Sequence, residues 1–164
     1  MCILFLAFIF SACGTHGSIK GYQYPTKKEN LQQAIMKVIK NNSNIKRDTS
    51  LDYLGSSPLL DHGDNYSAGD NYYNDIKHYV TLTITSGQDI NDYTFRYYGP
   101  DEDWETFNNS EIFICYAWDK NHKGGSEGDG GITRKMTKQF TAIFEKEFID
   151  KVDQELGLTH IDAE

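Results

Sequence analysis

Three segments in the second half of the chain carry β-strand patterns, and these constrain the fold most. Residues 76–85 alternate apolar side chains with threonine, lysine and tyrosine, which is the period-two pattern of a half-buried strand. Residues 93–98 alternate in the same way, with Tyr93, Phe95 and Tyr97 on one face. Residues 111–118 are apolar on both faces, which is typical of a central strand covered on both sides.

Two amphipathic helices flank the strand segments. Residues 27–41 carry one apolar stripe at helical spacing, and Thr26 with Glu29 matches a capping box. A second helix begins after Thr133 and ends at Gly157, a residue type that commonly terminates helices. Its stripe consists of Met136, Phe140, Ile143, Phe144, Phe148, Val152 and Leu156. The chain after Gly157, including His160, is expected to fray.

The element order α-β-β-β-α predicts an α+β fold with two helices packed on one face of an antiparallel meander. The meander has three strands, or four, and a further short strand is expected at residues 51–54. The rest of residues 48–75 is broken by Gly, Asn and Ser, and reads as a long loop. The 164 residues suit one domain, expected at residues 23–164.

The N-terminal residues have the character of an export signal. Residues 2–12 carry no charge and are too few to span a bilayer, but they fit the apolar core of a signal peptide. The run Phe10-Ser11-Ala12-Cys13 resembles the lipobox of bacterial lipoproteins. The resemblance implies that residues 1–12 are a signal peptide and that Cys13 becomes the lipidated first residue. Residues 13–22 would then be a flexible tether.

The same resemblance implies a location in the cell envelope, on the outer membrane of a Gram-negative bacterium, where small lipoproteins of this kind occur. Signal peptides begin with basic residues, and none precedes Lys20, so we expect the translated chain to start upstream or Met1 not to be the initiator. Removal of Cys2 and acylation of Cys13 would leave Cys115 as a single thiol. It lies in an apolar strand, where a buried, inert cysteine is expected.

Charge points to the middle of the chain as the binding region. The net charge of −8 argues against nucleic acid and against an anionic membrane as partners of the protein surface. Residues 48–111 hold 13 acidic residues, opposed by Lys77 and Arg96, together with eight tyrosines. Acids steer a basic partner, and tyrosines supply contact area. The predicted partner-binding residues are Asp61, Asp64, Asp70, Tyr66, Tyr72 and Tyr73.

Metal and catalytic motifs are incomplete. Asp119 and Asn121 occupy the first and third positions of a calcium-loop pattern, but Lys123 stands at the fifth, so a plain turn is favoured. A looser calcium site among Asp61, Asp64 and Asp70 stays open beside simple solvation of a charged loop. The acids of residues 101–105 offer paired carboxylates for glycoside hydrolysis, although a run of acids is usually a solvated turn.

Three functions follow as hypotheses, and no cofactor is expected for any of them. The favoured one is a lipid-anchored binding protein that captures a basic protein partner, as an immunity protein or inhibitor does. The second is an accessory lipoprotein subunit of a cell-envelope complex. The third is an enzyme whose site the sequence does not reveal, and it ranks lowest because no catalytic signature is present.

Overall fold

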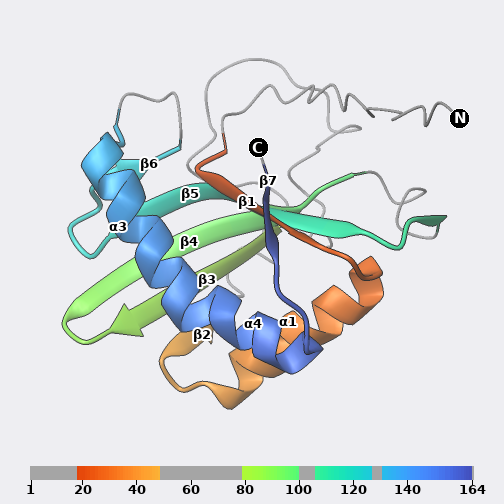
Figure 1. The fold of residues 1–164 in the computed structure, drawn as a ribbon. Helices are drawn as coiled ribbons and strands as arrows, with labels where there is room; N and C mark the ends of the chain where they lie inside the picture. Colours follow the sequence, from red (N-terminus) through yellow and green to blue (C-terminus); the bar gives the residue numbers. More distant parts are fainter. Residues whose placement is uncertain (1–17, 49–78, 100–105, 127–130, 164) are drawn as a thin grey trace, which may run out of the picture.

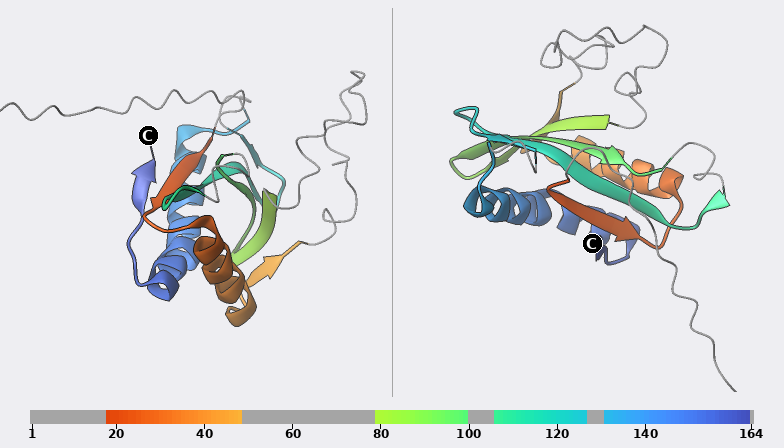
Figure 2. Two further views of the ribbon diagram at one scale, coloured as in Figure 1. Left: turned by 90° about the vertical axis from the view of Figure 1, so that its right-hand side faces the viewer. Right: turned by 90° about the horizontal axis from the view of Figure 1, so that it is seen from above.

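The computed structural model describes residues 18–48, 79–99, 106–126 and 131–163. These residues form an α+β fold in which one antiparallel sheet carries two helical segments on the same face (Figures 1 and 2). The strand order is β2-β3-β4-β5-β1-β7, and β6 pairs with β5 off this path. The predicted meander of three consecutive strands with two helices on one face is therefore confirmed.

The meander consists of β3 (Tyr79–Ser86), β4 (Asp89–Tyr97) and β5 (Ser110–Asp119). Along β4 the inward residues Tyr93, Phe95 and Tyr97 are buried, as the alternation predicts. Strand β5 is central, with β4 on one side and β1 and β6 on the other. The register of β4 and β5 shifts between Thr94 and Phe95, so that Cys115 is an extra residue in β5.

Strand β1 (Lys20–Tyr24) corrects the prediction of a flexible tether through residue 22. It pairs with β5 along its whole length, and Tyr22 and Tyr24 are buried against the helices. A Cβ on Gly21 would lie 2.8 Å from the Cβ of Ala163 in β7 (Ile161–Ala163), so a glycine is needed here. Taken alone, Lys20 and Gly21 have the composition of a linker. The segment forms a strand because it pairs with β5, which lies about ninety residues farther along the chain.

Three short strands were not predicted. Strand β2 (Ile45–Arg47) pairs with β3, β6 (Gly124–Gly125) pairs with β5, and β7 pairs with β1. None exceeds three residues, which is too short for a period-two pattern to register. The short strand expected at residues 51–54 lies outside the described residues.

Helix α1 (Lys28–Asn41) follows the predicted stripe, with Leu31, Ile35 and Val38 buried. The predicted capping box is wrong, because the residue before the helix is Lys27 and no side chain caps the first turn. The Thr26 hydroxyl instead accepts a hydrogen bond from the Asn30 side chain at 3.1 Å.

The C-terminal helical segment runs from α3 (Arg134–Phe144) through a π-helical turn, η3 (Glu145–Ile149), into α4 (Asp150–Leu156). The Thr133 hydroxyl accepts from the Met136 amide, and Gly157 closes the helix with a φ of 64°, both as predicted. The wider π turn lets the consecutive residues Phe148 and Ile149 both face the core. None of the helices in the four described ranges is long and apolar enough to cross a membrane.

The aromatic core lies between the helices and the covered face of the sheet. The Phe144 ring is fully buried and lies 5.0 Å from the Tyr93 and Phe148 rings, centroid to centroid. The Tyr93 hydroxyl donates to the Phe140 carbonyl oxygen at 3.0 Å. Cys115 is buried, as predicted, and burial raises the pKa of its thiol to about 12, which keeps it protonated and unreactive.

Candidate functional site

Most predicted site residues belong to segments that the structure does not describe. They are Cys13, Asp61, Asp64, Tyr66, Asp70, Tyr72 and Tyr73. The acids of residues 101–105 lie outside the described residues as well. What the structure supplies is the position at which residues 49–78 and 100–105 join the sheet.

Both of these acidic segments join the sheet at the same end. Asp48, the last described residue before the first segment, donates its amide to the Thr81 carbonyl at 3.0 Å, next to the start of β3. The second segment follows β4, where the Tyr98 amide donates to the Glu111 carbonyl at 2.9 Å. We call this end, where Asp48, Tyr79, Tyr98 and Ser110 lie, the acidic end. The opposite end, formed by the turns at residues 86–89 and 119–123, is the hairpin end.

The net charge of the whole chain resides in these two segments. Residues 49–78 contain five aspartates and one lysine, and residues 100–105 contain four acids and no base. Removing those nine of the 24 acids and that one of the 16 bases leaves 15 of each in the rest of the chain. Charge that is concentrated in one part of a protein steers a charged partner toward that part.

The open face of the sheet, opposite the helices, carries a row of rings that begins at the acidic end. The Arg96 guanidinium carbon lies 4.5 Å from the Phe113 ring centroid and 6.0 Å from that of Tyr79. The Tyr98 ring follows, 6.5 Å from the Phe113 ring. At these distances, a cation and the face of an aromatic ring attract each other electrostatically. Farther toward the hairpin end, Tyr116 and Trp118 stack with their planes 8° apart.

Two rings at the acidic end are well exposed to solvent. Tyr98 is 47% exposed, and Phe107, three residues before β5, is 54% exposed. Exposed aromatic rings rimmed by charged residues are typical of interaction sites. The tyrosine-rich composition of the sequence points to Tyr98 but not to Phe107, which stands alone in a polar loop and gives no periodic signal.

Not all tyrosines of the acidic region contribute to its surface. Tyr93 and Tyr97 point to the helix-covered face and are buried. Counting them as contact surface was therefore wrong, because strand alternation places them on the face opposite Arg96 and Tyr98. Burial raises the pKa of both hydroxyls far above the ordinary value for tyrosine, so they stay neutral.

The calcium-loop residues form a self-contained turn. The Asp119 Oδ1 atom accepts hydrogen bonds from the backbone amides of Asn121 at 2.8 Å and Lys123 at 2.9 Å. The Lys123 amide contributes most to lowering the pKa of this carboxyl below its usual value. Among the described residues, no three His, Cys, Asp or Glu side chains converge in a way that suits a metal ion. The favoured interpretation of a plain turn accounts for this geometry.

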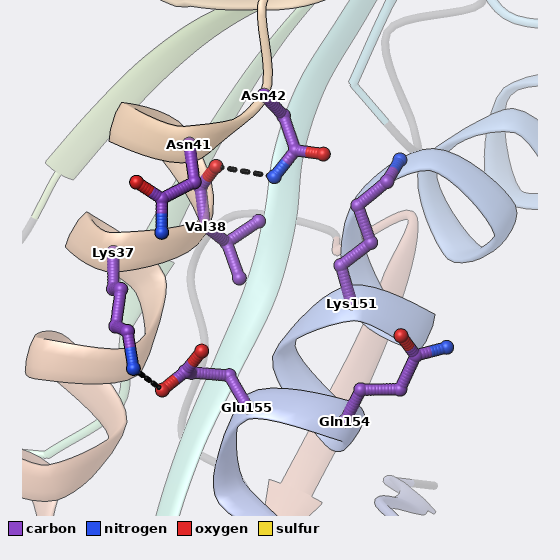
Figure 3. Close-up of a pocket in the computed structure, with 7 residues that line it drawn as sticks. All are labelled: Lys37, Val38, Asn41, Asn42, Lys151, Gln154 and Glu155. Atoms are coloured by element: carbon purple, nitrogen blue, oxygen red, sulfur yellow. Dashed lines mark hydrogen bonds and ion pairs between the residues drawn. The ribbon is translucent and has the colours of Figure 1, made fainter.

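A shallow pocket of about 290 Å³ lies between α1 and α4 (Figure 3). Lys37 and Glu155 reach toward one another across it and form an ion pair. The Asn42 side chain donates to the Val38 carbonyl at 2.7 Å. The ion pair bridges the two helices, whereas the Asn42 hydrogen bond lies within the C-terminal end of α1.

The C-terminus contains a polar cluster rather than the frayed end expected from the sequence. His160 Nδ1 lies 2.9 Å from Asp153 Oδ2, and the imidazole meets the Tyr22 ring edge-on at 5.3 Å. Lys20 Nζ lies 2.9 Å from Asp162 and 2.6 Å from Glu145. The Lys20–Asp162 pair ties β7 to β1, and the contacts with Glu145 and Asp153 tie the two segments to the C-terminal helical segment.

The chain was also compared with known proteins. A scan of protein-family models, a search of curated proteins and a search of solved structures each found no match to this chain.

Proposed function

We propose that this chain is a lipid-anchored binding protein of the cell envelope that captures a basic protein partner at its acidic end. The most concrete form is an immunity protein or inhibitor that blocks a basic toxin or hydrolase. The observation that carries the proposal is the junction of both acidic segments with one end of the sheet. Asp48 bonds to Thr81 near the start of β3, and Tyr79 at that start pairs with Arg96 near the end of β4, two residues before Tyr98.

The direction of β1 supports an orientation with the acidic end away from the membrane. Strand β1 runs toward the acidic end, so the residues that precede β1 approach this strand from its other end. Ile19 already donates its amide to the Ile114 carbonyl at 2.8 Å. A lipid on Cys13 would thus be separated from Ser18 by five residues, about 17 Å of extended chain. The domain would stay close to the bilayer while its acidic end faces the partner.

The anchor is tested by Cys13→Ala, with membrane fractionation and lipid labelling of the full chain. We expect the variant to lose the lipid label and to move to the soluble fraction. A variant that stays membrane-bound to the same extent would contradict the lipobox interpretation. Cys115→Ala is the matched control, because this buried thiol is far from the anchor in sequence and should leave fractionation unchanged.

The partner is tested by affinity capture from detergent-solubilised membranes, with the captured proteins identified by mass. The triple variant Asp61→Asn, Asp64→Asn, Asp70→Asn should lose the basic partner that the unaltered chain captures. A captured toxin or hydrolase supports the inhibitor form, and a membrane complex supports the accessory-subunit alternative. Equal capture by both chains would remove these aspartates from the binding site.

A further inference from the structure

A group of exposed bases lies at the hairpin end, where the start of α3 meets β6. The two elements touch through their backbones, because a Cβ on Gly131 would lie 2.7 Å from the Gly124 carbonyl oxygen. Figure 1 shows β6 and the start of α3 at one corner of the molecule. We call the bases on either side of this contact the basic corner, and they are Lys123, Arg134, Lys135 and Lys138.

The first turn of α3 carries charge of the sign that a helix disfavours there. The amides at a helix N-terminus carry partial positive charge, so acids stabilise the first turn and bases do not. Helix α3 begins with Arg134 and Lys135 and has no acid in its first turn. Arg134 and Lys138 are four positions apart, a spacing at which like charges repel. All three are exposed, and none forms an ion pair with another described residue, which indicates a role outside the fold.

The residues that precede β1 reach the sheet beside the basic corner. Strands β1 and β6 both pair with the edge of β5 that lies opposite β4. Lys20, at the start of β1, pairs with Ile114, and β1 runs away from β6. Gly125 in β6 pairs with Ala117, three residues farther along β5 and about 10 Å away. An anchor at Cys13 would therefore hold this corner close to the bilayer.

The net charge of the chain does not describe this corner. Residues 123–138 contain four bases and two acids, a local charge of +2 in a chain whose total is −8. Charges more than about 8 Å apart are largely screened at physiological ionic strength, so an anion at the corner responds to the charge nearby. The argument from net charge against an anionic membrane therefore does not apply to this part of the surface.

We propose that the basic corner lies against anionic phospholipid headgroups of the membrane that holds the anchor. The inference rests on the proposed function and adds to it the face that the protein turns toward the bilayer. Bases near an anionic membrane each contribute about fivefold in affinity, and a basic surface beside a lipid chain supplies a second membrane signal. The nearby anchor favours lipid over an acidic protein as the occupant.

The test measures cosedimentation of the full chain carrying Cys13→Ala with vesicles at physiological ionic strength. This variant has no attached lipid, and its apolar N-terminal residues contribute equally to every comparison. Vesicles of mixed phosphatidylglycerol and phosphatidylcholine should bind it at least about tenfold more tightly than phosphatidylcholine alone. The added changes Arg134→Gln, Lys135→Gln and Lys138→Gln should reduce this preference to about twofold or less.

The matched control removes three exposed bases from α1 and β2, which lie away from the start of α3 (Figure 1). It combines Lys27→Gln, Lys40→Gln and Lys46→Gln, changes the net charge equally, and should keep the preference. The α3 variant should melt no lower than its parent, because the bases it removes repel one another. A lower melting temperature would overturn the claim that these bases do not serve the fold.

Equal affinity for the two kinds of vesicle, or equal loss of preference in the α3 variant and the control, would overturn the proposal. Tighter binding of polyglutamate than of the anionic vesicles would also overturn it, in favour of an acidic protein. The capture of a basic partner is measured without vesicles, so these outcomes leave that part of the proposed function standing. Loss of capture with the vesicle preference intact would overturn the proposed function and leave the basic corner.

Discussion

The two ends of the sheet use their charged residues differently. At the hairpin end, Glu147 accepts hydrogen bonds from Ser86 Oγ at 2.9 Å and Asn44 Nδ2 at 3.0 Å, and forms an ion pair with Lys151. At the acidic end, the two adjoining segments together carry nine acids and one lysine. The difference teaches that the charge of Glu147 at the hairpin end joins elements of the fold, whereas we propose that the excess of acids in the segments that join the acidic end serves an external partner.

The largest loss of stability is expected for Phe144→Ala, and the other variants are compared with it. The ring is fully buried among other aromatic rings, and its removal should lower the free energy of unfolding by about 3–5 kcal/mol. The matched change at the acidic end, Tyr98→Ala, should cost less than about 0.5 kcal/mol, because this ring is half exposed. Urea unfolding followed by circular dichroism measures both, and similar losses would break the comparison.

Glu147→Ala should have the next largest effect. It removes a mostly buried carboxylate that joins β3, the turn before β2 and the helical segment, and should cost about 1–3 kcal/mol. Lys146→Ala is the control, since that side chain is 74% exposed and should cost less than about 0.5 kcal/mol. If Glu147→Ala were as stable as the control, the hairpin end would not depend on its internal pairs.

Acid should weaken the hairpin end through the same residue. Burial opposes ionisation of Glu147, but hydrogen bonds from Ser86 and Lys151 outweigh it and lower its pKa below the ordinary 4.5. A lowered pKa in the folded state adds stability that is present above pH 4.5 and is lost as the pH falls through the folded value. Glu147→Gln should therefore lose less stability than the unaltered chain on acidification, as thermal melts from pH 6 to pH 3 would report. Parallel melting curves would contradict this.

The smallest effect on stability is expected at the acidic end. The triple variant Asp61→Asn, Asp64→Asn, Asp70→Asn should change the free energy of unfolding by less than about 0.5 kcal/mol, as is usual for surface substitutions. Its association rate with a basic peptide should fall and depend less on salt, while dissociation changes little. Stopped-flow mixing at two salt concentrations measures this, with Asp89→Asn as the single-charge control. An unchanged salt dependence would show that these aspartates do not steer the partner.

The sequence predicted the parts of the fold that local patterns encode. The stripe of α1, the alternation of β3 and β4, the Thr133 cap and the Gly157 terminator are each determined by residues a few positions apart. Strands β1 and β7 were missed because their stability comes from pairing with distant chain. The site was predicted by composition, and composition cannot distinguish Tyr97, which faces the core, from Tyr98, which faces solvent. That distinction needs the strand register.

The most direct test of the account is an amide NMR titration of the ¹⁵N-labelled full chain in detergent with nona-arginine. The account predicts chemical-shift changes that are concentrated at the acidic end, at Tyr79, Tyr98 and Glu111, and that weaken as salt increases. The amides of Gly87 and Asn121, in the two turns of the hairpin end, should shift little. Changes that are spread evenly over both ends, or confined to the hairpin end, would contradict the claim that the acidic end binds the partner.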